Sequence, residues 1–347
     1  MSAAVDRAEA TEIARSLDAS LASILTLNEL LEAARTDRPL DAARQADLVG
    51  LGWSAIAVGE AHGGLALDAT ARAAIAAVAG RRLLPAALRG ESALLAPALA
   101  ALADAGDAQA AQWLERLLAG ELRGGGAVLP AARAGDHALV ALAPDARLVA
   151  LVEGDRATVV ELDGAPQTFD ALDRGQGYAR VPIAAGEHVV TGAPVHALVA
   201  AWRLALLGEA YGAGLHVLEQ SVVYAGQREQ FGRAIAGFQA VAHRLAAMAV
   251  ELEAADAGIG RLVAADAAGV DADELGELLA HQVPAATRHV CESAIQVHGG
   301  IGFTWELGLH LHYRRVLLLQ AELGGAEASA QAVGARYLAR RREAARV

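Results

Sequence analysis

The sequence contains no lysine, a single cysteine and few aromatic side chains, which make up 4% of its 347 residues. Without lysine the chain cannot form a P-loop, because that motif places a lysine on the phosphates of a nucleotide. The single thiol, Cys291, excludes an intramolecular disulfide framework and a zinc centre built from thiolates. The sequence also lacks a Gly-x-Gly-x-x-Gly turn between strand and helix and a Gly-x-Ser-x-Gly nucleophile motif.

The charge balance and the apolar runs exclude two further classes. The chain carries 29 basic residues, all arginine, against 41 acidic ones, a net charge of −12. A nucleic-acid-binding protein needs a basic surface instead, to replace the counterions of phosphate. The apolar stretch 195–218 is interrupted by Arg203, Glu209 and His216, so we expect no membrane span there. Glu9 and Glu12 stand where a secretory signal is basic and apolar, and we therefore expect a cytoplasmic protein.

The pair His310 and His312 is the nearest approach to a metal-binding pattern. Two residues that are two positions apart point to different faces of a helix, and no third ligand is evident. We therefore expect no metal site in this chain.

The composition and its change along the chain predict three parts. Abundant alanine favours helix, because alanine loses no side-chain entropy on becoming helical. From Gly124 to about Pro194 the apolar runs are short, rich in valine and separated by Gly, Asp and Pro, which is typical of strands and turns in one small sheet. The sequence therefore predicts a mostly α fold with a small middle β domain: a helical domain over 1–122, a β domain over 123–193 and a helical bundle over 194–347.

Within the third part, the apolar spacing predicts long helices. Between Phe238 and Leu252 the apolar residues recur every three or four positions and form a broad stripe. The same pattern continues over 271–295, where we expect Pro284 to kink or split the helix.

Two segments of the third part differ from ordinary packing patterns. The first, 224–232, reads Tyr-Ala-Gly-Gln-Arg-Glu-Gln-Phe-Gly, and the second, 296–306, reads Gln-Val-His-Gly-Gly-Ile-Gly-Phe-Thr-Trp-Glu. An arginine and a glutamine beside glycines can hold a large anionic cofactor, because a guanidinium binds phosphate bidentately and glycine lets backbone N–H groups approach. Taken alone, each segment is more simply a loop between bundle helices with glycine at the helix end.

Taken together, the two segments resemble the acyl-CoA dehydrogenase family. The resemblance is carried by Arg-x-x-Phe-Gly at 228–232, by the Phe-Gln that follows at 238–239, and by Gln-Val-His-Gly-Gly-Ile-Gly at 296–302. Weaker agreement comes from Leu-Gly-Trp at 51–53 and Glu-x-x-Gly-Gly at 60–64, although the family usually has proline in place of Gly59. The family's order of domains, ending in a four-helix bundle, also agrees.

The resemblance implies an FAD bound between subunits and the oxidation of an acyl-CoA thioester to its 2,3-enoyl form. In that family a carboxylate removes the α-proton while a hydride passes from the β-carbon to the flavin. By the resemblance, Arg228 meets the FAD pyrophosphate and Phe231 lies beside the cofactor. The other implied FAD contacts are Gln239, Gln296, Val297, His298, Gly299 and Gly300.

The chain departs from the family at both positions that hold its catalytic glutamate. Counting back from the Arg-x-x-Phe-Gly motif gives Trp202, and counting forward from Arg314 and Arg315 gives Leu323. Neither side chain accepts a proton. Glu322 is the remaining candidate base, but a shift of one residue turns a side chain by about 100° around a helix.

The β domain departs from the family as well. The family holds the flavin ring with a Thr-, Gly- and Ser-rich stretch, whereas residues 124–131 read Gly-Gly-Gly-Ala-Val-Leu-Pro-Ala and offer no hydroxyl. The chain thus resembles the short subunit of an actinobacterial α2β2 acyl-CoA dehydrogenase of sterol catabolism, whose longer partner supplies the base and most of the flavin-ring pocket. Its electrons would pass to an electron-transfer acceptor. Two alternatives stay open: a self-sufficient homo-oligomer that uses Glu322, and a non-catalytic helical scaffold.

Overall fold

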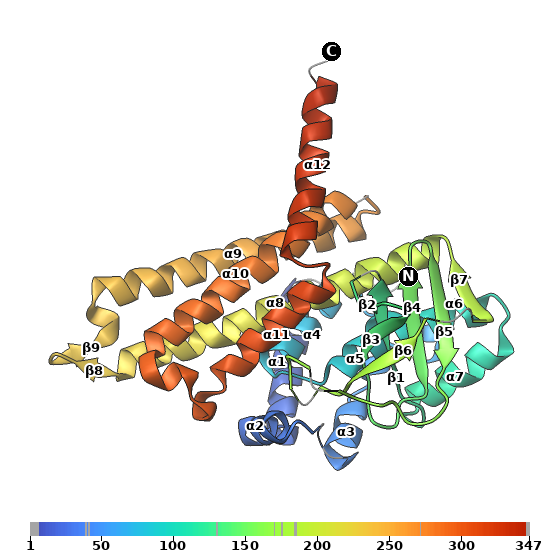
Figure 1. Ribbon diagram of the computed structural model, residues 1–347, viewed down its shortest axis with the longest axis horizontal. Helices are drawn as coiled ribbons and strands as arrows, with labels where there is room; N and C mark the ends of the chain where they lie inside the picture. The colour runs from blue at the N-terminus through green and yellow to red at the C-terminus, as the bar shows by residue number, and fades with distance from the viewer. Residues whose placement is uncertain are drawn as a thin grey trace.

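A computed structural model describes residues 7–38, 40, 42–129, 131–169, 171–174, 176–183, 186–270 and 272–344. Pro130, within the stretch 124–131 discussed above, and residue 271 lie outside the described residues. Helices come first, short strands follow, and long helices complete the chain (Figure 1). This order confirms the mostly α fold with a small β region in the middle.

The first helical part contains one long apolar helical run that is mostly buried. Its helices are α1 (Arg7–Ile24), α2 (Leu27–Thr36), α3 (Ala42–Val49), α4 (Ala69–Arg81), α5 (Ala86–Gly90), α6 (Ala96–Asp104) and α7 (Ala108–Leu118). A π-helical turn at Glu91–Leu95 joins α5 to α6 without a break. The resulting run Ala86–Asp104 is, among the described helices, the one long and apolar enough to cross a membrane. Since 78% of it is buried inside the protein, it has the character of a core helix.

The middle part forms two sheets, where the sequence predicted one. The first sheet has the order β1 (Gly124–Leu129), β4 (Leu148–Glu153), β5 (Arg156–Glu161), β7 (His188–Thr191), and the second has the order β2 (Arg133–Ala134), β3 (His137–Ala141), β6 (Tyr178–Pro182). The run Leu148–Val152 is apolar on both faces of its strand. One face packs with the helices and the other with the second sheet, because a strand that is apolar on both sides needs two covers.

Glycines set how closely the backbones approach at two crossings. Where α5 meets β1, a Cβ on Gly90 would lie 2.4 Å from the nitrogen of Gly126. Where α4 crosses the long helix α8 (Ala193–Gln227), a Cβ on Gly212 would lie 1.8 Å from the carbonyl oxygen of Ala77. No side chain fits at either point, so the positions of α4, α5, α8 and β1 are fixed relative to one another.

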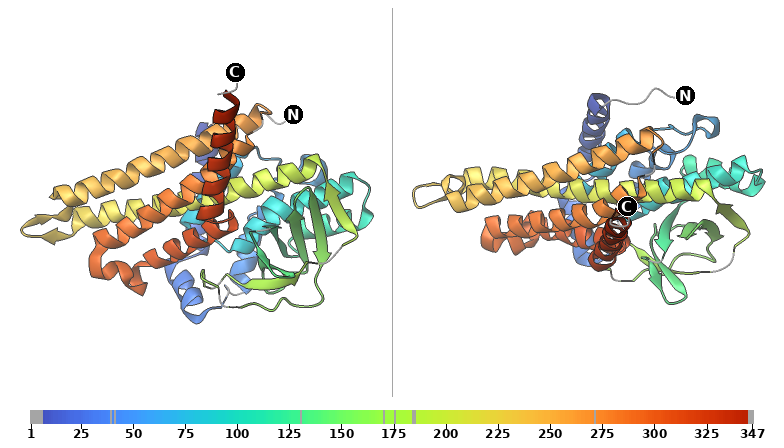
Figure 2. Two further views of the ribbon diagram at one scale, coloured as in Figure 1. Left: turned by 45° about the horizontal axis from the view of Figure 1, so that its top comes forward. Right: turned by 90° about the horizontal axis from the view of Figure 1, so that it is seen from above.

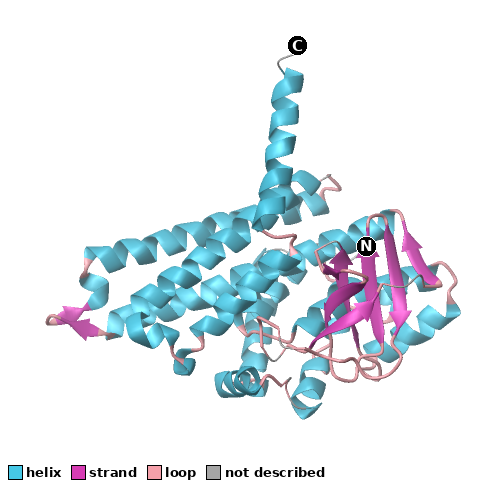
Figure 3. Ribbon diagram, in the orientation of Figure 1, coloured by secondary structure: helices cyan, strands magenta, loops and turns pink. Residues whose placement is uncertain are grey.

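The long C-terminal helices lie side by side, and the strands β1 to β7 gather at one end of the molecule (Figures 2 and 3). These helices are α8, α9 (Gln239–Ala267), α10 (Asp273–His298) and α11 (Leu309–Glu322). The hairpin of β8 (Glu229–Gln230) and β9 (Arg233–Ala234) joins α8 to α9 at the opposite end, and α12 (Ala326–Ala344) projects from the body (Figure 1). Of the two outcomes expected at Pro284, a kink or a split, the split is wrong: α10 continues through this residue, which is buried in the bundle, so tertiary packing outweighs the missing hydrogen bond.

Candidate functional site

The hairpin at the far end of the bundle presents the first motif to solvent. Arg228 follows the last residue of α8, and its backbone N–H donates to the carbonyl oxygen of Tyr224 at 2.8 Å. Its guanidinium forms no ion pair or hydrogen bond within the described part of the chain, so it is available to an anion. Phe231 is 93% exposed and holds a φ of 52°, an uncommon conformation for a residue with a side chain.

The second motif lies against the first at the same end of the bundle. α10 ends at His298, and Gly299 follows with a φ of 64°, which lets the chain turn into a short helix over Gly299–Phe303. The rings of Tyr224 and His298 stack with their centres 4.4 Å apart, and the Tyr224 hydroxyl donates to the His298 carbonyl oxygen at 3.4 Å. The structure therefore brings together two motifs that are about seventy residues apart.

The residues of the second motif divide into exposed and buried ones. Gln296, Gly299 and Gly300 are exposed, as is Gln239 at the start of α9. Val297 and His298 are buried, and His298 Nδ1 donates to the carbonyl oxygen of Ala294 at 2.8 Å, so these two side chains face the bundle. Burial lowers the pKa of His298, which keeps its ring neutral at pH 7. An exposed arginine and exposed glycine backbone fit an anion such as a pyrophosphate.

A second set of predicted positions meets elsewhere, between β1, α8 and the end of α11. Gly126 and Ala127 of β1, Trp202 of α8 and Glu322 of α11 line one cavity together with Arg89 of α5. The two regions that the family resemblance assigns to the flavin ring and to the base therefore do converge. The cavity measures only about 10 Å³, which is the room of roughly one water molecule. The residues present do not fit a flavin ring, because their own side chains fill this place.

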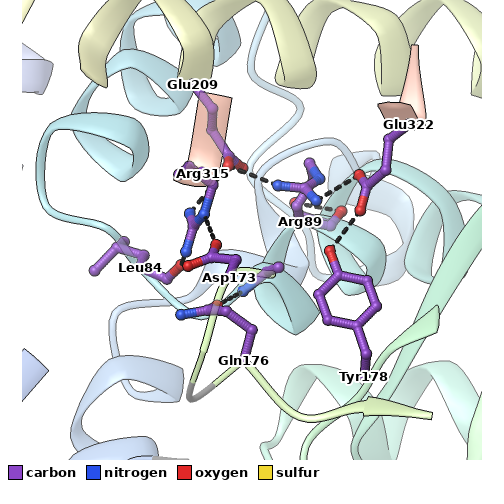
Figure 4. Close-up of polar contacts among 10 residues, drawn as sticks. Leu84, Arg89, Asp173, Gln176, Tyr178, Glu209, Arg315 and Glu322 are labelled. Atoms are coloured by element: carbon purple, nitrogen blue, oxygen red, sulfur yellow. Dashed lines mark hydrogen bonds and ion pairs between the residues drawn. The ribbon is translucent and has the colours of Figure 1, made fainter. Parts of the chain in front are cut away.

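Arg89 is the centre of the side chains that fill it. Its guanidinium donates to Glu209 and to Glu322, each at 2.6 Å, and its side chain is 2% exposed (Figure 4). The guanidinium carbon also lies 5.1 Å from the centre of the Trp202 ring, in cation–π range. Burial alone would lower the pKa of Arg89, but the Glu209 and Glu322 carboxylates raise it above its usual value. The arginine is therefore charged and held from three sides.

Glu322, the candidate base, has both carboxylate oxygens engaged. One oxygen accepts from Arg89, and the other accepts from the Tyr178 hydroxyl at 2.5 Å. Burial and then the adjacent Glu322 carboxylate raise the pKa of Tyr178 well above its usual value, so the phenol stays protonated and remains a donor. Leu323 follows Glu322 at the end of α11. A carboxylate held in this way is poorly placed to take a proton from a substrate.

Arg315 extends the same cluster away from the cavity. It donates to Glu209 at 3.3 Å, to the carbonyl oxygen of Leu84 at 2.9 Å and to the buried carboxylate of Asp173 (Figure 4). Burial tends to lower the pKa of Arg315, but the Asp173 and Glu209 carboxylates raise it. The cluster thus ties α5, α8, α11 and the segment before β6 into one unit.

Sequence reasoning missed this cluster, whose members are Arg89, Asp173, Tyr178, Glu209, Arg315 and Glu322. A signal was present, since Arg89 and Glu209 each stand within a long apolar stretch where a charge must find a partner. The described residues contain no group of three or more His, Cys, Asp or Glu able to hold a metal ion. His312 instead stacks on His216 with ring centres 4.7 Å apart.

Comparisons with known proteins match both ends of the chain. A family model for the acyl-CoA dehydrogenase C-terminal domain matches residues 195–338, and one for the N-terminal domain matches residues 10–121. The acyl-CoA dehydrogenase FadE34 of Mycobacterium tuberculosis is 40% identical over 151 residues, which is 40% of this chain and 20% of that protein. The chain therefore matches only about a fifth of the length of this relative.

Two solved structures share the fold over nearly the whole chain. The ChsE4-ChsE5 complex of Mycobacterium tuberculosis superposes with a TM-score of 0.76 at 20% identity, covering 95% of this chain and 97% of that chain. The Tcur3481-Tcur3483 steroid ACAD G363A variant superposes with a TM-score of 0.76 at 23% identity, covering 94% and 96%. At these identities the superpositions establish a common fold.

Proposed function

The chain belongs to the acyl-CoA dehydrogenase family, and from this premise we propose that it is a subunit of a hetero-oligomeric, FAD-dependent acyl-CoA dehydrogenase that needs a longer homologous partner. The partner supplies the catalytic base and most of the flavin-ring pocket. The observation that carries this proposal is the cavity between β1, α8 and α11, where Arg89, Trp202 and Glu322 leave about 10 Å³. A solved relative of the same fold is described as a complex of two chains.

The role of this chain is to complete the partner's cofactor site from the exposed end of its bundle. The Arg228 guanidinium would hold the FAD pyrophosphate, Phe231 would cover the cofactor, and Gln239, Gln296 and the backbone at Gly299 and Gly300 would add polar contacts. When bound, FAD would accept the hydride that leaves the β-carbon of the acyl-CoA. The electrons then leave to an electron-transfer acceptor.

The substrate class is the CoA thioester of a bulky apolar acid, as in sterol catabolism. Support comes from the structural relative described as a steroid enzyme. The product is the 2,3-enoyl-CoA, formed with the α-proton taken by a carboxylate of the partner.

The alternative of a self-sufficient enzyme based on Glu322 has less support. Its carboxylate is held by Arg89 and Tyr178, and the adjoining cavity admits no substrate. A pure scaffold is also less supported, since it needs neither the Arg228 guanidinium, which has no partner among the described residues, nor an exposed aromatic side chain at Phe231.

Co-expression tests the proposal. The chain expressed alone should carry no flavin absorbance, whereas co-expression with a longer homologue should give a yellow complex that oxidises acyl-CoA. Arg228→Ala should weaken FAD retention by the complex about tenfold or more, since a charge-assisted contact to phosphate is lost. Arg261→Ala is the matched control, because this arginine is exposed on α9, away from the hairpin, and should leave FAD content unchanged.

The proposal fails if the chain alone is yellow and turns over acyl-CoA. Equal FAD content in the Arg228→Ala complex and the Arg261→Ala complex would contradict the proposal that the exposed end of the bundle holds FAD.

A further inference from the structure

A groove of about 490 Å³ beside α8 has no part in the proposed function. It lies between the first half of α8, the start of α4, the end of α9, and the residues Val270, Ala272 and Asp273. Its volume lies within the range of about 300–1,000 Å³ typical of small-molecule sites. Ala200, Leu204, Leu262 and Val263 give it apolar walls, and Arg72 and Arg203 bring two cations into it.

The two arginines are more buried than Asp266 and Asp273, the carboxylates with which they form ion pairs. The side chains of Arg72 and Arg203 are 26% and 19% exposed, whereas those of Asp266 and Asp273 are 55% and 71% exposed. Cationic groups therefore form the floor of the groove, and the carboxylates stand at its solvent edge. An anion that enters the groove meets the arginines at closer range than it meets the aspartates.

Arg72 is the less well satisfied of the two arginines. Its Nη2 lies 4.0 Å from the Asp266 carboxylate, beyond hydrogen-bond distance, and its buried Nε has no hydrogen-bond partner. By contrast, Arg203 Nη1 reaches Asp273 at 3.5 Å. The Nε is closed to solvent, so a ligand oxygen would bind at the outer nitrogens of the guanidinium, where Asp266 is too far away for a hydrogen bond.

Arg72 also stands in a wall shared with a second, inner cavity. Arg72, Ala201 and Leu204 line both the groove and a second cavity of about 40 Å³, which reaches Trp53 on one side and Arg89 and Glu209 on another. Arg72 therefore shares this wall with apolar side chains. Such surroundings strengthen an interaction with an anion, because water competes less there.

From these contacts we infer that the groove binds an amphiphilic monocarboxylate, with the carboxylate on Arg72 and an apolar body against the alanine, leucine and valine side chains of α8 and α9. The ligand oxygen accepts from the guanidinium of Arg72 and takes the place of the distant Asp266. The groove contains no residue of the Arg89 cluster and none of the proposed FAD contacts, and it gives the chain a ligand-binding role apart from oxidation.

Decanoate is a suitable probe, measured by isothermal titration with the full chain in the oligomer in which it is purified. We expect saturable binding of one decanoate per chain. Arg72→Gln should weaken binding about tenfold or more through loss of a charge-assisted hydrogen bond. Ala200→Trp should abolish binding by filling the groove. Arg261→Gln, an exposed change outside the groove, should bind like the wild type, and decanol should show no dependence on Arg72.

Two results would overturn the inference: no saturable decanoate binding by the wild type, or equal affinity in Arg72→Gln and wild type. Circular dichroism and the FAD content of the complex accompany each variant. A variant that loses decanoate binding but keeps its FAD content shows that this site is separate from the proposed function. A variant that loses FAD but still binds decanoate shows the same.

Discussion

Replacement of Arg89 by methionine should strongly destabilise the chain. Its guanidinium is 2% exposed and bridges Glu209 and Glu322, whose side chains are 5% and 13% exposed. Methionine fills much of the same space but leaves Glu322 with the Tyr178 hydroxyl as its one remaining partner in the cluster. Breaking a buried ion pair costs about 3–5 kcal/mol, because the remaining charge stays desolvated.

Urea unfolding at pH 7 measures this loss, and a second substitution tests its cause. Arg89→Met should lower the free energy of unfolding by about 3–5 kcal/mol. Adding Glu322→Gln removes the stranded charge, so the double variant should be more stable than Arg89→Met alone by about 1–3 kcal/mol. A double-mutant cycle then gives the coupling between the two residues.

The reasoning is refuted if Arg89→Met costs no more than an exposed ion pair, about 0–1 kcal/mol. It is also refuted if Glu322→Gln brings no recovery in the Arg89→Met background. Either result would mean that the cluster is not tightly desolvated. It would then no longer follow that its side chains fill the place of a flavin ring.

Two further predictions concern the bundle. Burial lowers the pKa of His312 to about 3 and that of His216 to about 4, below the unfolded value of about 6.5. The unfolded chain therefore binds more protons between these values, so the free energy of unfolding should fall as the pH is lowered through this window, and urea midpoints at pH 7 and pH 5 would show it. Gly212→Ala should destabilise the chain by about 1–3 kcal/mol or more through overpacking against Ala77, whereas Gly260→Ala, with open space around it, should stabilise it by about 0.5–1 kcal/mol. Equal thermal midpoints for the two glycine variants would contradict the close crossing of α4 and α8.

The helices and the order of the parts could be predicted because they depend on local patterns. The apolar stripe beginning at Phe238 is repeated every three or four residues, and the helix α9 occupies that stretch. A split at Pro284 could not be judged in this way, because it does not depend on a local pattern. Its outcome depends on what packs around the proline, which a local rule does not contain.

The Arg89 cluster could not be predicted because its members are far apart in the sequence. Arg89 is separated from Glu209 by 120 positions and from Glu322 by 233. Charge in an apolar stretch indicates that a partner exists, but it does not say which residue that partner is. The same limit applies to Glu322, which the sequence left available as a base and the structure places in an ion pair.

The filled cavity and the exposed hairpin lie at two different ends of the C-terminal bundle, so one can change without the other. The cavity is lined by β1 and by Trp202 in the first half of α8, whereas Arg228 follows the last residue of α8 and begins the segment that forms the β8–β9 hairpin. Figure 1 shows this hairpin at the end of the molecule opposite the sheets. Substitutions that fill the cavity therefore leave the hairpin untouched. Phe231 has a positive φ and is 93% exposed, and both features are unfavourable for an isolated chain. The stability of this chain alone does not account for these two features of Phe231. A cofactor and a partner that cover the hairpin would account for both.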